Sequence, residues 1–127
     1  MGDFVGGTLK YLRLHPIPRL TIAGGFAKLS KLGAGLLDLH SKRSSVDLVW
    51  LIDEVAAAGS TGALIEQLSA AETAGQALQI AQKSEFPIAD LVARKARETA
   101  MEHVASETTV DVMVFDRHGD LVGRSDA

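Results

Sequence analysis

The stretch that most constrains the fold of this chain is residues 19–41, RLTIAGGFAKLSKLGAGLLDLHS, which combines a β-rich run, a glycine pair and an amphipathic segment. In the β-rich run, Leu20 and Ile22 alternate with Thr21, and this pattern predicts a short strand. The two glycines that follow are predicted to break the extended backbone. The stretch is therefore expected to begin as a strand that ends in a tight turn.

A helix is expected next, from about Ala27 to Leu37, because leucines recur on one side of it with Lys28 and Lys31 among them. A strand, a glycine turn and a helix form the local plan of an anion-binding site, since the first helical turn presents unpaired N–H groups and the positive end of the helix dipole. The glycine pair matches neither the GxGxxG pattern nor a Walker loop. On the glycines alone, a plain strand-to-helix turn is the favoured interpretation, and an anion site is the alternative.

Charge is distributed unevenly along the chain, whose net charge is −3. Residues 1–43 carry seven basic and two acidic side chains, whereas residues 44–127 carry six basic and fourteen acidic ones. An anionic ligand near the basic, glycine-rich third is therefore expected, with ordinary solvated helix charges as the simpler alternative. Nucleic acid is not expected as a partner, because the whole chain is acidic and has few aromatic residues on which bases can stack.

The composition excludes several further classes of site. The chain has no cysteine, which excludes disulfides and thiolate metal sites and fits a cytoplasmic protein. Its four histidines share no metal-ligand spacing, so no metal site is predicted. No run approaches the ~20 apolar residues of a transmembrane helix, so no membrane association is expected.

The remaining elements are predicted from periodicity, capping residues and turn residues. Helices are expected over residues 8–14, 46–58, 60–70, 73–83 and 88–104, and a closing hairpin over residues 110–122. The helix over residues 88–104 has a weak apolar stripe, so we expect it to pack along one edge only. His118 falls in the hairpin turn, where an exposed loop residue is the simplest interpretation.

This order of elements favours a single α/β domain over residues 1–127, in which helices cover a small, mostly parallel sheet that ends in a β-hairpin. A glycine-rich segment that leads into a helix normally follows a strand, yet the segment before the first expected helix has no strand ahead of it. A doubly wound sheet also needs more strands than this sequence provides. We therefore expect the chain to be an incomplete part of a larger fold.

Three segments agree in order and spacing with one known family. They are Gly2-Asp3-Phe4-Val5-Gly6, then Gly24 to Lys28 continuing to Lys31, Ala34 and Gly35, and finally His40-Ser41. The first is similar to a Gly-Asn/Asp-Phe-aliphatic-Gly segment, the second to Gly-His-aliphatic-Gly-Lys-x-x-Lys-x-x-x-Gly, and the third to Thr-His-Ser. Together they resemble the cobalt-precorrin-5B C(1)-methyltransferases, the CbiD family of anaerobic cobalamin biosynthesis.

The chain departs from the family pattern at three positions. Gly25 stands where the family often has histidine, Ala27 where it often has glycine, and Leu39 replaces the threonine before His40. Family members are also much longer, so the resemblance implies a C-terminal domain whose N-terminal partner domain belongs to the same protein. The isolated chain is expected to be inactive.

The resemblance implies transfer of a methyl group from the cofactor S-adenosylmethionine to ring carbon 1 of a cobalt-corrinoid substrate. The protein then mainly has to orient donor and carbon nucleophile and exclude water. The residues implied as cofactor-binding are Gly2, Asp3, Phe4, Gly6, Gly24 and Gly25. Those implied as binding the carboxylates of the substrate are Lys28, Lys31, Lys42 and Arg43. His40 and Ser41 are implied as catalytic, although His40 can also be read as a loop histidine that bonds the backbone.

Two alternatives from other functional classes stay open at this point. One is a non-catalytic α/β module that binds a phosphate or nucleotide at Gly24-Gly25, which the basic, glycine-rich first third favours. The other is a structural docking or dimerisation domain, in which the glycines only permit close packing and a second copy of the chain is the partner.

Overall fold

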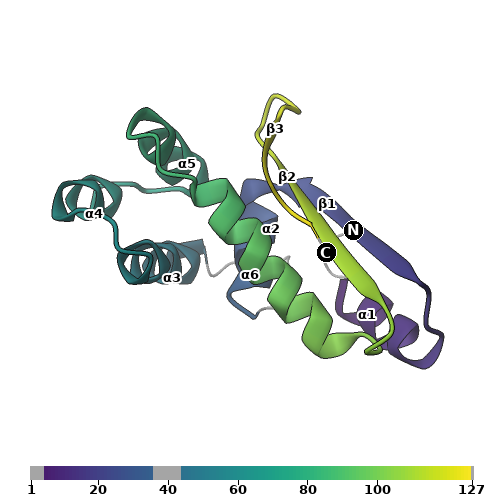
Figure 1. Ribbon diagram of the computed structural model, residues 1–127. Coiled ribbons are helices and arrows are strands. Elements are labelled where there is room, and N and C mark those ends of the chain that lie inside the picture. Colours follow the sequence, from purple (N-terminus) through teal and green to yellow (C-terminus); the bar gives the residue numbers. More distant parts are fainter. Residues whose placement is uncertain (1–4, 36–43, 127) are drawn as a thin grey trace.

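The computed structural model describes residues 5–35 and 44–126 (Figure 1). The helices of these parts are α1 (Val5–Leu14), α2 (Phe26–Gly33), α3 (Ser44–Ala57), α4 (Gly62–Ser69), α5 (Ala74–Lys83) and α6 (Ile88–His103). The strands are β1 (Arg19–Gly25), β2 (Thr109–Phe115) and β3 (Leu121–Ser125). Figure 1 shows α2 to α6 gathered on one side of the sheet, with α6 running along it. None of the helices in the described ranges combines the length and hydrophobicity needed to cross a bilayer.

The strands form one mixed sheet in the order β1-β2-β3. β1 and β2 run parallel in full register, from Arg19 opposite Thr109 to Gly25 opposite Phe115. β2 and β3 are the antiparallel arms of a hairpin, with an irregularity between Val114 and Phe115. The predicted α/β sheet with a C-terminal hairpin is therefore confirmed, and the sheet combines one parallel and one antiparallel pair.

The glycine pair continues β1 instead of breaking it. Gly24 pairs with Val114 and Gly25 with Phe115, and the chain turns only at Phe26, where α2 begins. The predicted break in the extended backbone is wrong, because pairing with β2 keeps the glycines in the strand. α2 also ends earlier than expected, at Gly33; Gly35 then adopts φ +91°, a conformation that glycine takes without strain.

The core lies between the sheet and α6. Val110, Val112 and Val114 are fully buried on the face of β2 that α6 covers. The buried residues of α6 are Ile88, Ala89, Leu91, Val92, Ala93, Ala96, Thr99 and Ala100. The prediction that this helix packs along one edge only is wrong. Its small alanines make the apolar stripe look weak in sequence, yet they let α2, β2 and β3 all approach the helix closely.

Two glycines mark the closest approaches to α6. A β-carbon added at Gly123 of β3 would lie 2.4 Å from the carbonyl carbon of Ala89. One added at Gly33 of α2 would lie 2.9 Å from the ring of Trp50 and 3.2 Å from the β-carbon of Lys95. All three separations are shorter than ordinary van der Waals contact, so a side chain at either position would force its neighbours to move.

Capping residues define the ends of the middle helices. Thr73 Oγ1 accepts the N–H of Gln76 at 3.1 Å, and Gln76 Oε1 accepts the N–H of Glu72 at 2.7 Å. Gly59 follows α3 with φ +86°. These contacts confirm the predicted start of α5 and the predicted end of α3.

Candidate functional site

A cavity of about 730 Å³ opens where the parallel strands end, and three segments surround it. One is the turn from β1 into α2, residues 25–27; the second is one side of α5, from Thr73 to Gln82; the third is residues 115–118, at the end of β2 and in the hairpin loop. Figure 1 shows the hairpin tip, α5 and the start of α2 at the same end of the sheet. Ligands of α/β proteins commonly bind at this carboxyl edge.

The turn from β1 into α2 offers backbone N–H groups to the cavity. Gly25 is the N-cap of α2 and has no side chain with which to cap it, so the N–H groups of the first turn border the cavity without a side-chain acceptor. A β-carbon added at Gly25 would meet no atom within 4 Å, which shows that the space before it is open. The positive end of the helix dipole adds to the preference for an anionic group here.

One face of α5 gives the cavity polar side chains. Thr73, Gln76, Gln79 and Gln82 are spaced three residues apart, lie on one side of the helix and all line the cavity. Each glutamine amide carries both a hydrogen-bond donor and an acceptor. Apolar Leu78 lines the same wall, so this side can contact a ligand with both aromatic and polar parts.

The hairpin loop gives the cavity its basic groups. Asp116 Oδ1 accepts the N–H of His118 at 2.8 Å and that of Asp120 at 3.0 Å, and Gly119 turns the chain with φ +85°. The hydrogen bond from the Asp120 N–H, followed by that from His118, lowers the pKa of Asp116 below its ordinary value. The ionised carboxylate thereby fixes the loop that carries exposed Arg117 and His118 at the cavity.

The structure brings some of the sequence-predicted residues to this cavity. Gly25 lines it, whereas Gly24 lies half-buried in β1, where an added β-carbon would contact Leu29 at 3.8 Å. Lys28 is exposed on the first turn of α2, one residue beyond the lining, and Lys31 is half-buried one turn further. Gly6 lies in α1. The predicted residues Gly2, Asp3, Phe4, His40, Ser41, Lys42 and Arg43 lie outside the described residues.

Sequence reasoning missed the walls that α5 and the hairpin contribute. The three-residue spacing of Thr73, Gln76, Gln79 and Gln82 was a usable signal for a polar helical face. His118 is an exposed loop residue, as predicted, but it also lines the cavity. Its place beside Gly25 depends on the parallel pairing of β1 with β2, since the carboxyl ends of parallel strands meet at the same edge.

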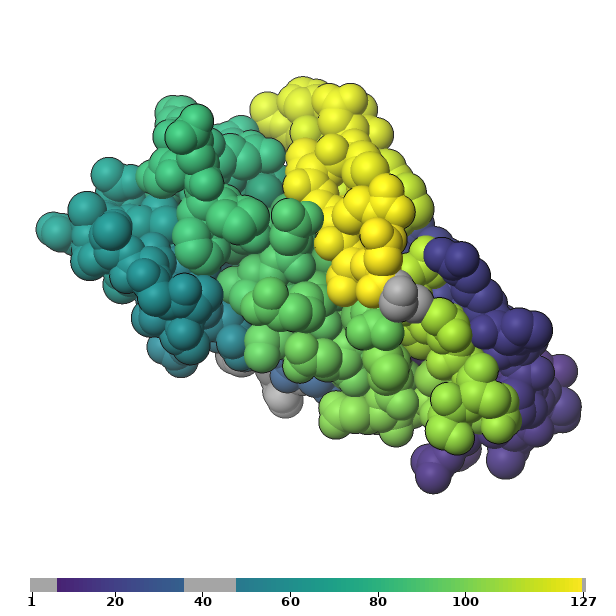
Figure 2. Space-filling view, in the orientation of Figure 1, coloured from purple at the N-terminus to yellow at the C-terminus, as the bar shows by residue number. Residues whose placement is uncertain are grey.

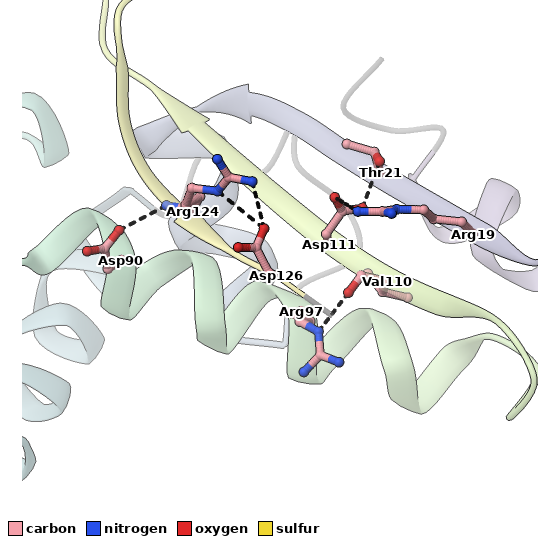
Figure 3. A network of polar contacts seen from close by, with 8 residues as sticks. All are labelled: Arg19, Thr21, Asp90, Arg97, Val110, Asp111, Arg124 and Asp126. Carbon is pink, nitrogen blue, oxygen red and sulfur yellow. Dashed lines mark hydrogen bonds and ion pairs between the residues drawn. The ribbon is translucent and has the colours of Figure 1, made fainter.

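A separate polar network lies along the strands themselves, and its residues do not line the cavity (Figure 3). The carboxylate of buried Asp111 accepts the Arg19 guanidinium at 2.9 Å and the Thr21 hydroxyl at 2.7 Å. The Arg19 hydrogen bond, followed by that from Thr21, lowers the pKa of Asp111. The network joins β1 to β2 and is structural. Over residues 5–35 and 44–126, no group of three or more histidines and carboxylates is arranged to hold a metal ion.

Comparison with known proteins identifies the family. The family described as "CbiD, C-terminal domain" matches residues 38–126. Curated relatives called cobalt-precorrin-5B C(1)-methyltransferase match nearly the whole chain. The relative from Bradyrhizobium sp. strain BTAi1 is 54% identical over 125 residues, covering 98% of this chain and 33% of its own length. That from Rhodospirillum rubrum is 52% identical over 124 residues, covering 97% and 35%.

A third relative, from Paramagnetospirillum magneticum, is 51% identical over 124 residues, which is 97% of this chain and 34% of that protein. The chain thus spans about a third of the length of the curated relatives it matches. No solved structure matches it significantly. The resemblance drawn from three short segments is confirmed, and the chain belongs to the CbiD family, with residues 38–126 forming the C-terminal domain of that family.

Proposed function

We propose that this chain is the C-terminal part of a cobalt-precorrin-5B C(1)-methyltransferase, and that its cavity binds the methyl donor S-adenosylmethionine beside the corrinoid substrate. The observation that carries the proposal is the position of Gly25. This residue lies within the segment that resembles the glycine–lysine segment of the family, at the position where the family often has histidine, and it lines the cavity at the carboxyl end of the parallel strands.

The cavity fits such a donor in size and chemistry. Its volume of about 730 Å³ lies within the range of small-molecule sites. Phe26, Leu78 and Phe115 give it apolar surface for an adenine ring, and the glutamines of α5 give it hydrogen-bonding groups for a ribose. The N–H groups at the start of α2 suit the carboxylate of the donor.

Methyl transfer from a sulfonium requires correct positioning of the reactants and charged groups that bind the substrate, more than it requires a reactive side chain. S-adenosylmethionine supplies a methyl group already activated on a sulfonium. The residues of this chain hold the donor and the ring carbon in line, and they exclude water. The substrate ring carries acetate and propionate groups. Arg117, which lines the cavity, and Lys28 and Lys31 of α2 are their proposed partners.

The other residues implied by the family resemblance remain part of the proposal. Gly2, Asp3, Phe4 and Gly6 are proposed to complete the cofactor site, and Lys42 and Arg43 to add substrate contacts. His40 and Ser41 are proposed to position or deprotonate the ring. We propose that the whole enzyme acts in the cytoplasm and needs its N-terminal domain for activity.

Calorimetric titration with S-adenosylhomocysteine tests the proposal, with this chain joined to the N-terminal part of its own full-length protein. Gly25→Leu fills the open space before the first turn of α2, and we expect it to weaken binding at least tenfold, about 1.4 kcal/mol. Gly62→Leu is the matched control, since Gly62 also has nothing within 4 Å and does not line the cavity. Unchanged affinity in folded Gly25→Leu would refute the cavity as the donor site.

A phosphate- or nucleotide-binding module is the second candidate, favoured by the uncapped start of α2. Lys28→Ala separates the two functions. A phosphate-binding module loses affinity for inorganic phosphate in this variant. The methyltransferase instead loses corrinoid turnover while its phosphate affinity stays the same.

A further inference from the structure

β1 is an edge strand whose outer side has no partner strand in the described part of the chain. The N–H of Thr109 donates to the carbonyl of Pro18 at 3.0 Å. This bond shows which alternate residues of β1 direct their backbone N–H and C=O groups toward β2. Backbone groups of Leu20 and Ile22 therefore face β2, whereas those of Thr21 and Ala23 face outward. The outer side of a seven-residue strand is thus available for pairing.

The opposite edge of the sheet is protected against pairing, and the contrast is informative. The N–H of Arg124 in β3 donates to Asp90 Oδ1 of α6 at 2.9 Å, so α6 occupies a donor on that edge (Figure 3). The Arg124 side chain bonds Asp126 at 2.8 Å, and the β2–β3 ladder is irregular near Val114. Charges, bulges and covered edges are the usual devices that stop strands from pairing with other chains.

Within the described residues, β1 shows no bulge and no covering element along its outer side. Its sequence, RLTIAGG, contains no proline and no lysine, and its register with β2 is regular throughout. Its one charged residue, Arg19, bonds Asp111 of the neighbouring strand. Figure 2 shows the segment that includes β1, in dark blue, along the outer right side of this face. An unprotected edge of this length is typical of a strand that has a partner.

The position of α1 indicates where that partner comes from. α1 contacts α6, and Leu9 of α1 is buried in the same core cluster as the residues of α6, so both helices lie on the covered face of the sheet. A helix between two parallel strands makes a right-handed crossover almost without exception. When two successive right-handed crossovers place their helices on the same face of a sheet, each new strand is added on the same side of the strand before it. A strand that precedes α1 would therefore lie beside β1, opposite to β2.

We propose that the outer edge of β1 pairs in parallel with a strand that precedes α1 in the full-length chain. The curated relatives are about three times as long as this chain, and the matching family is a C-terminal domain, so they contain the length of chain that such a strand needs. The order becomes partner strand, β1, β2 and β3. The pairing continues the sheet into the N-terminal part, and it does not depend on the proposed methyltransferase function.

Residue-resolved hydrogen exchange of the full-length Rhodospirillum rubrum relative tests this pairing. The informative amides are those aligned with Thr21 and Ala23, which face outward, and those aligned with Leu20 and Ile22, which face β2. We expect all four amides to exchange slowly. The exchange rate of the outward pair should be ~100-fold lower than that of an exposed amide. The inward pair is the internal control, because it reports an intact β1–β2 ladder.

Three outcomes decide the matter. Slow exchange of the outward pair that is independent of protein concentration supports the proposal. Fast exchange of the outward pair beside a slow inward pair overturns it, because the edge is then free in the full-length protein. Protection that disappears on dilution also overturns it, since the partner is then a second copy of the chain.

Discussion

Asp111 of β2 lies opposite Thr21 of β1 and accepts its hydroxyl hydrogen at 2.7 Å, although the two residues are 90 positions apart in the sequence. The same carboxylate accepts the Arg19 guanidinium at 2.9 Å. Asp111→Asn replaces the carboxylate by a neutral amide and so weakens both bonds. We expect it to lower the free energy of unfolding by about 1–2 kcal/mol in urea titrations. The loss is no larger because Arg19 is largely exposed and solvent screens its charge. Thr21→Val, which removes one hydroxyl and keeps the branched shape, should cost less.

Acid should weaken the fold through the same carboxylate. The folded pKa of Asp111 lies below its ordinary value, which is about 3.9 in unfolded chains. Its contribution is therefore fully present above pH ~4, and it is lost as the pH falls through the folded pKa, where the native carboxylate takes up a proton. Asp116 should act in the same direction. Urea midpoints at pH 7 and pH 3 measure the loss, and Asp111→Asn should show a smaller drop than the parent chain.

Gly123 should tolerate no side chain. A β-carbon there would lie 2.4 Å from backbone of Ala89, so β3 would have to move away from α6. We expect Gly123→Ala to lower the free energy of unfolding by about 2–3 kcal/mol, by overpacking. Gly62→Ala is the matched control, since that position is open and helical, and it should leave stability unchanged within about 0.5 kcal/mol. Equal melting temperatures of the two variants would contradict the close approach.

The two threonine caps should differ in strength. Thr73 Oγ1 accepts its N–H at 3.1 Å, whereas Thr61 Oγ1 accepts that of Leu64 at 3.4 Å, near the limit of a hydrogen bond. Thr73→Ala is expected to cost about 1 kcal/mol, and Thr61→Ala clearly less. Thermal unfolding followed by circular dichroism compares them. A larger loss of stability in Thr61→Ala would show that the hydrogen-bond distance of a cap does not determine how much the cap stabilises its helix.

Arg117 should contribute to binding of a carboxylate-bearing substrate. It is exposed at the cavity, on the loop that Asp116 fixes. Under the proposed function, Arg117→Ala in the full-length protein is expected to raise KM for the corrinoid roughly tenfold with a smaller effect on kcat, as for the loss of one charge-assisted contact. Arg94→Ala is the control, because it removes another exposed arginine, on α6, that does not line the cavity. Similar KM values in the two variants would argue against a role for Arg117.

The local rules of sequence reasoning predicted the elements well, because caps, glycines and periodicity act over a few residues. Thr73, Gly59 and the alternation around Ile22 each mark a boundary or type of element that the structure confirms. The family resemblance implied a cofactor-binding role for Gly25. Gly25 lines the cavity, and its role there stays a prediction.

The predictions from sequence were wrong or incomplete where contacts with distant parts of the chain determine the structure. The extended conformation of Gly24 depends on pairing with Val114, and the central place of α6 depends on neighbours that fit its alanines. His118 reaches the cavity for the same kind of reason, since only a parallel β1–β2 pair brings the hairpin loop to Gly25. Short-range patterns contain no information on such pairings.

The parallel pairing of β1 with β2 also sets the order in which this protein can be made. Thr21 and Asp111 are 90 residues apart, and the intervening chain forms five of the helices. At ~5–20 residues per second, a ribosome takes on the order of 5–20 seconds to synthesise that segment. β1 therefore emerges long before β2, and the ladder that shapes the cavity forms only after the helices between them have been synthesised. During synthesis, the edge of β1 that later pairs with β2 stays exposed until β2 has been made, and this edge is where we expect chaperones to act.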